Sequence, residues 1–183
     1  MKKVFWGILL AMANVGAILT LAFSLLGGGR FVSWFSIAAD LSVALGYLLI
    51  MLGARDLPGG NFGYAATLSK ILCAFTAAVF ALNLLNIMPG GTIATILYWA
   101  ADLGSFITMY FCVLGVGDLE RGGGGYLGAD RLQKTFTVWV VLNLLGSFIS
   151  YLTLAALGAY VVLLVYFWKA SRSYKGGGGW RVY

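Results

Sequence analysis

The sequence predicts an all-α integral membrane protein, with six transmembrane helices arranged as three parallel two-helix repeats. Three observations predict this fold class. Of the 183 residues, 61% are hydrophobic and 10% are charged, against roughly 45–50% and about 25% in soluble domains. Long apolar runs alternate with short polar segments. Finally, a 27-residue stretch beginning at Ala38 is echoed 62 residues later.

Five apolar runs match the length of about 20 residues that a transmembrane helix needs. Lys2 and Lys3 precede the first run as in a secretory signal, but the run continues beyond the cleavage-like Ala11-Met12-Ala13, so we expect a span there. The runs are Val4–Leu26, Phe31–Leu52, Ile71–Met88, Thr92–Val116 and Phe136–Trp168.

The last run has 33 residues, which suits either one overhanging helix or two short spans joined by a turn. With six spans, eleven of the twelve Lys and Arg residues lie on the side of both termini, and only Arg30 lies opposite. With five spans the division becomes seven against five. Because positive residues concentrate on the cytoplasmic side, the charges favour six spans with both termini in the cytoplasm.

The echo supports the same count. It has 11 identities in 27 positions, among them Ala38-Ala39-Asp40-Leu41 and Ala100-Ala101-Asp102-Leu103. Extended toward the carboxyl terminus, the echo predicts a turn at Ser150–Thr153. An even number of spans in each unit makes the repeats parallel. The single membrane domain, 1–183, then has hairpins at about 4–52, 71–116 and 135–169, cytoplasmic linkers at 53–70 and 117–134, and a cytoplasmic tail at 170–183.

Asp40 and Asp102 are the candidate binding residues, because both fall near the middle of a predicted span. An ionised carboxylate there costs on the order of 3 kcal/mol, so each must be protonated, face a wet cavity or hold a cation. One interpretation is a site for a proton, a cation or a cationic substrate. The other is a neutral Asp that packs against another helix through a hydrogen bond. The third unit has Ala155-Ala156-Leu157-Gly158 at the matching place, so a threefold site would be incomplete.

Other functional classes find little support. The chain has no His, the commonest general base and transition-metal ligand. We interpret Cys73 and Cys112 as buried apolar side chains rather than a disulfide or a metal pair. Residues 123–128 fit a dinucleotide-binding pattern formally, but a predicted membrane span precedes them, where that pattern requires a strand. We therefore expect no enzyme activity, cofactor, metal or nucleic acid.

Tryptophans near the ends of the predicted spans are expected to anchor the helices at the headgroup region. They are Trp6, Trp34, Trp99, Trp139 and Trp168.

Two loose motifs carry a resemblance. They are LGYLLIMLG at 45–53, followed by Asp56-Leu57, Leu68 and Lys70, and GVGDLE at 115–120, followed by Leu127-Gly128-Ala129 and Leu132. In these the chain resembles a group of small six-span membrane proteins of Firmicutes-type bacteria that has no established activity. The resemblance implies a bacterial cytoplasmic membrane and the same topology, and it implies no function.

Three functions stay open. The first is a structural or accessory membrane component in the lipid bilayer, as a homo-oligomer or with a membrane-protein partner. The second is a small transporter or channel that uses Asp40 and Asp102. A membrane enzyme is the third and the least supported, because without His, and without Lys or Arg in a span, only carboxylate or cytoplasmic-face chemistry remains.

Overall fold

The computed structural model describes residues 1–12, 29–85, 91–123, 125–146 and 149–174, and in these residues every regular element is a helix. Parts of the first predicted span, of the glycine-containing segments 27–30 and 89–91 between predicted spans, and of the tail lie outside the described residues. The helices are α1 (Lys2–Met12), α3 (Gly29–Arg55), α4 (Gly60–Leu84), α5 (Thr92–Arg121), α6 (Ala129–Gly146) and α7 (Ser150–Ser173).

Within the described residues, three helical segments are long and apolar enough to cross a membrane. They are Gly60–Leu82 in α4, Thr95–Arg121 in α5 and Leu154–Ser173 in α7. Their outward faces carry large apolar side chains, such as Ile71, Ile96 and Leu154, which are 60%, 61% and 73% exposed. Helices with apolar residues on every side are typical of a lipid environment. The chain is therefore an all-helical protein of the membrane type.

The 33-residue apolar run forms two helices. Helix α6 ends at Gly146 and α7 begins at Ser150, so Ser150–Thr153, where the sequence predicts the turn, belongs to α7. Gly146 lies where the helix stops, and glycine has a low helix propensity. The backbone of Ile149 is extended and starts the next helix. The run is divided as predicted, but the division lies a few residues earlier.

The connections at 53–70 and 117–134 are shorter than predicted, because the polar residues there are mostly helical. Helix α4 already begins at Gly60, and α5 continues to Arg121. Polar side chains on an exposed helix end do not interrupt the backbone, whereas residues with positive φ do. Gly59, with φ 118°, lies just before α4, and Gly128, with φ 76°, lies just before α6.

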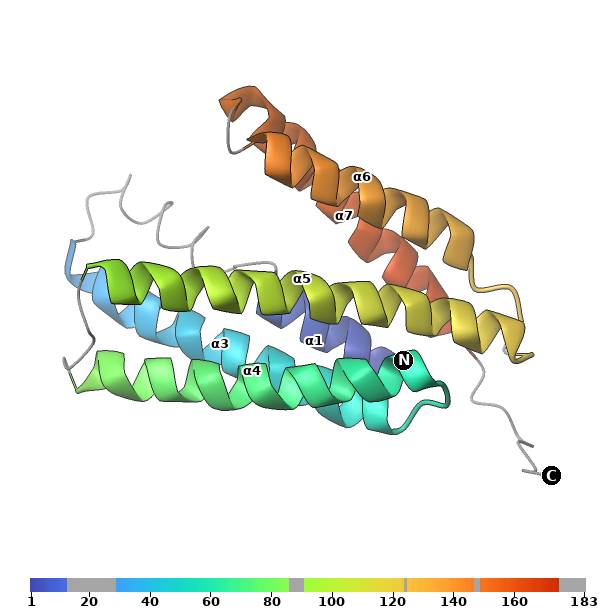
Figure 1. The fold of residues 1–183 in the computed structure, drawn as a ribbon, viewed down its shortest axis with the longest axis horizontal. Helices are drawn as coiled ribbons and strands as arrows, with labels where there is room; N and C mark the ends of the chain where they lie inside the picture. Colours follow the sequence, from blue (N-terminus) through green and yellow to red (C-terminus); the bar gives the residue numbers. More distant parts are fainter. Residues whose placement is uncertain (13–28, 86–90, 124, 147–148, 175–183) are drawn as a thin grey trace.

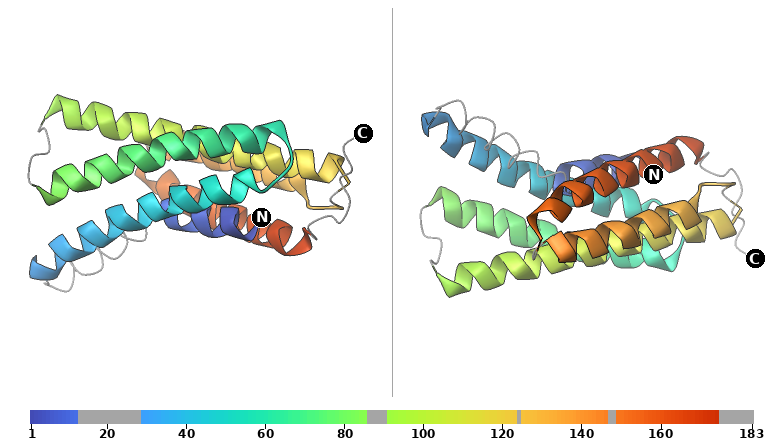
Figure 2. Two further views of the ribbon diagram at one scale, coloured as in Figure 1. Left: turned by 90° about the horizontal axis from the view of Figure 1, so that it is seen from below. Right: turned by 90° about the horizontal axis from the view of Figure 1, so that it is seen from above.

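The helices form a ring in chain order. Each described helix packs against the next one along the chain, α7 packs back against α1, and α5 also contacts α1. Figure 1 and the two views of Figure 2 show α6 and α7 as a hairpin beside α5 and α1, inclined away from them at one end. The Tyr160 hydroxyl of α7 donates a hydrogen bond of 3.4 Å to the carbonyl oxygen of Ile8 in α1.

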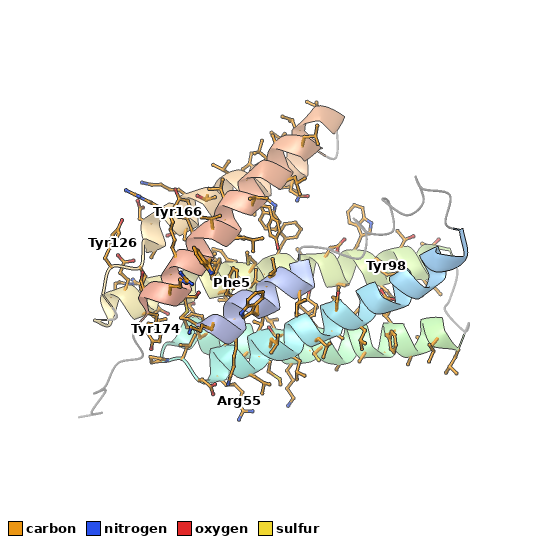
Figure 3. The ribbon with its side chains drawn as sticks, turned by 180° about the vertical axis from the view of Figure 1, so that it is seen from behind. Phe5, Arg55, Tyr98, Tyr126, Tyr166 and Tyr174 are labelled. Carbon is orange, nitrogen blue, oxygen red and sulfur yellow. The ribbon has the colours of Figure 1, made fainter. Side chains whose placement is uncertain are left out.

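One end of the bundle collects the polar connections, and we call it the polar end. It contains the amino terminus, the α3–α4 and α5–α6 connections and the carboxyl end of α7 (Figure 1). Figure 3 shows Tyr126 and Tyr174 at this end, whereas Tyr98 lies far from it along α5. The arrangement follows from alternating helix directions, because each hairpin returns the chain to the same end.

Two glycines of the sequence echo, Gly53 and Gly115, lie where helices approach closely. A Cβ atom at Gly53 would lie 2.8 Å from the backbone nitrogen of Val4 in α1. A Cβ atom at Gly115 would lie 2.7 Å from the ring of Phe62 in α4. Each glycine thus lets its helix pack against the preceding helix, which is the role of small residues in membrane helix packing.

Candidate functional site

A half-open cavity of about 300 Å³ lies between α1, α3, α4, α5 and α6, and both Asp40 and Asp102 line it. Asp40 lies in α3 and Asp102 in α5, near the middle of each helix. Asp40 is half-buried and Asp102 is exposed. The structure thus brings the two sequence-predicted site residues to one cavity, from helices that are not neighbours along the chain.

Helical spacing explains how each helix presents its residues. On α3, Val43 and Tyr47 follow Asp40 by three and seven positions and share its face. On α5, Tyr98 and Ser105 lie four positions before and three positions after Asp102, on the same stripe.

The hydroxyl groups of the cavity wall are arranged to accept hydrogen bonds. Ser105 Oγ donates to the Ala101 carbonyl oxygen at 2.7 Å, and Thr76 Oγ1 donates to the Leu72 carbonyl oxygen at 2.8 Å. Tyr47 and Ser105 are hydrogen-bonded to each other. Since Ser105 has given its only proton to Ala101, the Tyr47 hydroxyl is the donor in this pair. These hydroxyl protons are all used in hydrogen bonds within the protein. Ser105 and Thr76 can therefore act toward a ligand only as hydrogen-bond acceptors.

Aromatic side chains form a large part of the wall. Phe75 of α4, Tyr98 and Phe106 of α5, and Trp139 of α6 all line the cavity. The Phe106 and Trp139 ring centroids lie 5.0 Å apart, and Trp139 also lies 5.5 Å from Tyr160 of α7. The Phe106–Trp139 pair connects the α6–α7 hairpin to α5, and the Trp139–Tyr160 pair joins the two helices of the hairpin.

The prediction that Trp139 is an interfacial anchor is corrected by its burial. Its side chain is only 8% exposed and belongs to the core. Its neighbours explain the difference: α6 packs on α5 at this point, and the indole fills the space beside Phe106. Trp99 and Trp6, at 75% and 54% exposed, keep the outward position that the prediction requires. The Trp34 side chain lies outside the described residues.

The electrostatics of the cavity are acidic. None of the described residues that line it is Lys or Arg. Asp40 also interacts with another group of the protein, so it is not an isolated carboxylate. Asp40 and Asp102 each bring negative charge to the cavity when they are ionised, and a bound proton or cation neutralises that charge. The arrangement favours cations and excludes anions.

The cysteines do not add to the site. Both are free thiols: Cys112 is wholly buried and Cys73 is half-buried, its Sγ lying 3.5 Å from the Ala44 carbonyl oxygen. Among the described residues, no group of three or more Asp, Glu, Cys or His side chains is placed to hold a metal ion.

The other four acidic residues lie near the polar end, and each has a partner inside the protein. Asp56 forms an ion pair of 2.7 Å with Lys3, and Asp130 forms one of 2.8 Å with Lys134. Glu120 accepts a hydrogen bond of 2.8 Å from the backbone N–H of Ala129, which begins α6. A negative charge at a helix amino terminus is favourable, so Glu120 stabilises the start of this helix.

Asp118 has two partners, one on its own helix and one on α4. It accepts hydrogen bonds from the Asn61 side-chain amide at 2.7 Å and from Arg121 at 2.8 Å. A Cβ atom at Gly59 would lie 3.2 Å from the Asp118 side chain, so the α3–α4 turn rests directly on this residue. Asp118 therefore fastens the beginning of α4 to the end of α5.

Two groups at the polar end have shifted pKa values. The Lys3 ammonium lowers the pKa of Asp56 from its ordinary value through the hydrogen bond and the charge attraction. Burial lowers the pKa of the Met1 amino group, against the opposing attraction of Asp56. Both shifts follow from the packing of α1 against the end of α3.

Sequence reasoning found the two carboxylates but missed the hydroxyl and aromatic groups around them. The signal for Tyr47 and Ser105 was their helical spacing from Asp40 and Asp102. Nothing in the α6 sequence distinguishes Trp139 from an anchor, since its role depends on which helix packs beside it. Comparisons of the chain with protein-family models, with curated proteins and with solved structures gave no match. The resemblance to the Firmicutes-type group stays a prediction.

Proposed function

We propose that the protein is a small cation transporter or channel of a bacterial cytoplasmic membrane, with Asp40 and Asp102 at its binding site. The observation that carries this proposal is that both carboxylates line one cavity, together with hydroxyl oxygens free to accept. An intramembrane carboxylate is costly and is typically found where a proton or an ion binds. The site accordingly takes up a proton or a cation and releases it on the other side.

The proposed topology has six spans and both termini in the cytoplasm. Its support is that both described ends of the chain and the α3–α4 and α5–α6 connections lie at the polar end. Arg55, Arg121, Lys134 and Arg172 belong to helix ends on that side. By the positive-inside rule this end faces the cytoplasm. Helix α6, with 18 residues, is about 27 Å long, so it spans the bilayer only if it stands nearly upright.

We further propose that the first two hairpins are structural repeats. Gly53 and Gly115 support this, because each allows close packing against the preceding helix. Asp56 and Asp118, also 62 residues apart, each bind a residue near the start of that same preceding helix: Lys3 in α1 and Asn61 in α4. The proposed repeat makes Asp40 and Asp102 equivalent positions of two units.

The test is cation flux through liposomes that contain the purified protein. Proton flux is followed with an internal pH-sensitive dye, and sodium or rubidium flux with radioactive tracers. We expect Asp40→Asn and Asp102→Asn to reduce flux to the rate of protein-free vesicles, because amides bind neither protons nor cations as carboxylates do. Asp130→Asn, an exposed carboxylate at the polar end, is the matched control and should leave flux unchanged.

Circular dichroism and size-exclusion elution of each variant show whether it remains folded. If the wild-type protein conducts neither these ions nor an organic cation, or if both cavity variants conduct like the wild type, the proposal is wrong.

The second candidate is a structural or accessory component with no transport of its own. It is favoured by the interaction that Asp40 makes within the protein, which is what a packing role requires. In that case the carboxyl groups are protonated and join helices, and their amides should preserve assembly. Chemical cross-linking in native membranes then distinguishes a homo-oligomer from a complex with another membrane protein.

A further inference from the structure

We propose that the ligand of the cavity is an organic ammonium ion that carries apolar groups, rather than a bare metal ion. This inference rests on the proposed function and names its substrate class. It depends on three properties of the cavity: its size, its charge and its aromatic wall.

The cavity is larger than a metal ion requires. Its volume of about 300 Å³ corresponds to about ten water molecules and lies at the lower end of the range for small-molecule sites. A bare hard cation needs several oxygen ligands in direct contact with it, about six for Mg²⁺ and six to eight for Ca²⁺. The described residues bring no group of three or more acidic side chains together. The described wall offers a metal ion two carboxylates and a few hydroxyl oxygens among apolar and aromatic side chains, whereas a bulky organic ion fills the space and contacts that wall.

The charge of the cavity selects a cation. Asp40 and Asp102 supply negative charge, and no described Lys or Arg lines the wall to neutralise it. The Ser105 and Thr76 hydroxyl protons are bonded to backbone carbonyl groups, so these oxygens face a ligand as acceptors. An ammonium group offers N–H donors or a diffuse positive charge, both of which suit such a wall.

The aromatic wall distinguishes an organic cation from a hydrated inorganic one. Phe75, Tyr98, Phe106 and Trp139 line the same cavity as the carboxylates. Aromatic faces attract ammonium ions through cation–π contacts, and these strengthen when water is excluded. They also pack against the apolar substituents of the ion, which a hydrated sodium ion lacks. Carboxylates and aromatic rings together match a cation with an apolar body.

The test measures binding of benzyltrimethylammonium to the purified protein in detergent by isothermal titration calorimetry. Benzyl alcohol serves as an uncharged ligand of related shape, and sodium chloride as the inorganic competitor. We expect the ammonium ion to bind, benzyl alcohol to show no binding, and sodium at equal concentration not to displace the ammonium ion.

Two substitutions test the contacts separately. Asp102→Asn should lower the affinity at least about tenfold, because it removes a charge from the site. Tyr98→Leu should lower it by about threefold to tenfold through the lost cation–π contact. Tyr98 is 47% exposed, so this change spares the packed core. The neighbouring Trp99→Leu, at a position that is 75% exposed and outside the cavity lining, is the matched control and should have no effect.

Each alternative outcome has a definite meaning. Equal binding to the wild type and to Asp102→Asn shows non-specific partition and overturns the inference. Absence of ammonium binding, with carboxylate-dependent proton or sodium flux still present in liposomes, overturns the inference and leaves the proposed function intact. Absence of both overturns the two proposals together. If Asp102→Asn loses affinity and Tyr98→Leu does not, the aromatic wall does not contribute to binding, and this outcome overturns the inference of an organic ligand.

Discussion

The sequence echo contains two pairs of aspartates, and the bundle places them in different surroundings. Asp56 and Asp118 lie at the polar end, where one pairs with Lys3 and the other binds Asn61 and Arg121. Asp40 and Asp102 lie halfway along α3 and α5 on a cavity whose described lining has no basic residue. The same residue type, repeated at the same interval, thus joins helices in one place and lines a cavity in the other.

This difference separates stability from function. A carboxylate with a cationic or amide partner contributes to the folded state through that partner. An ionised carboxylate within an apolar span costs free energy, so under the proposed function Asp40 and Asp102 are retained for what they bind. Substituting one pair should therefore affect unfolding, and substituting the other pair should affect binding and flux.

The largest expected effect is the contrast between Asp102→Asn and Asp118→Asn. The first should abolish cation flux without lowering the unfolding temperature, because an amide removes an intramembrane charge. The second should keep flux and lower the stability by about 1–3 kcal/mol, the range for lost hydrogen bonds to a charged group. Liposome flux and thermal unfolding in detergent are measured on both variants. If both variants lose flux, or if both lose stability, the two pairs of aspartates do not have different roles.

A loss of stability of intermediate size is expected at the beginning of α6. Glu120→Ala removes the carboxylate that accepts from the Ala129 N–H, and it should destabilise the helix start by about 1 kcal/mol. Hydrogen exchange of the amides from Ala129 to Leu132 should become faster, while exchange in α4 stays the same. Glu120→Gln retains an acceptor, so its exchange rates at these amides should lie between those of the wild type and those of Glu120→Ala. Unchanged exchange in Glu120→Ala would exclude the capping role.

The smallest effect is expected from the exposed pair of Lys3 and Asp56, whose side chains are 58% and 62% exposed. Lys3 lowers the folded-state pKa of Asp56, so the pair contributes stability above the unfolded-state pKa of the carboxyl group. That contribution disappears as the pH falls through the lowered pKa. Asp56→Asn should slightly reduce the loss of stability that the protein shows as the pH falls, and added salt should have the same effect. The unfolding midpoints of the wild type and of Asp56→Asn are measured between pH 2 and 7. If they change equally with pH in both proteins, the ion pair contributes nothing to stability.

Much of the fold could be predicted because hydrophobicity and charge act locally along the chain. The apolar runs predicted helices, and the last run forms two helices, as its predicted division requires. That both of these helices cross the membrane stays a prediction. Helix ends were less predictable, since α4 extends back to Gly60 through residues whose polarity resembles a loop. The polar stretch stays helical because Gly59, and not the polarity, interrupts the backbone.

The candidate site was only half predictable for a related reason. Asp40 and Asp102 stand out because a carboxylate in an apolar run is costly on any arrangement of the helices. Trp139 and Phe106 become part of the cavity only because α6 packs on α5, and no local pattern states which helices are neighbours. Long-range pairs of this kind depend on the assembled bundle.

The contact between α7 and α1 has a consequence for biosynthesis. Tyr160 and Ile8, which it joins, are 152 positions apart in the chain. At about 5–20 residues per second, a ribosome needs roughly 8–30 s to make the segment between them. During that interval one flank of α1 has no permanent neighbour, so a chaperone or insertase that shields apolar helices would act on α1 until α7 emerges. Ribosome-bound chains that stop before Ser150 should therefore cross-link to such a factor through α1, and completed chains should not.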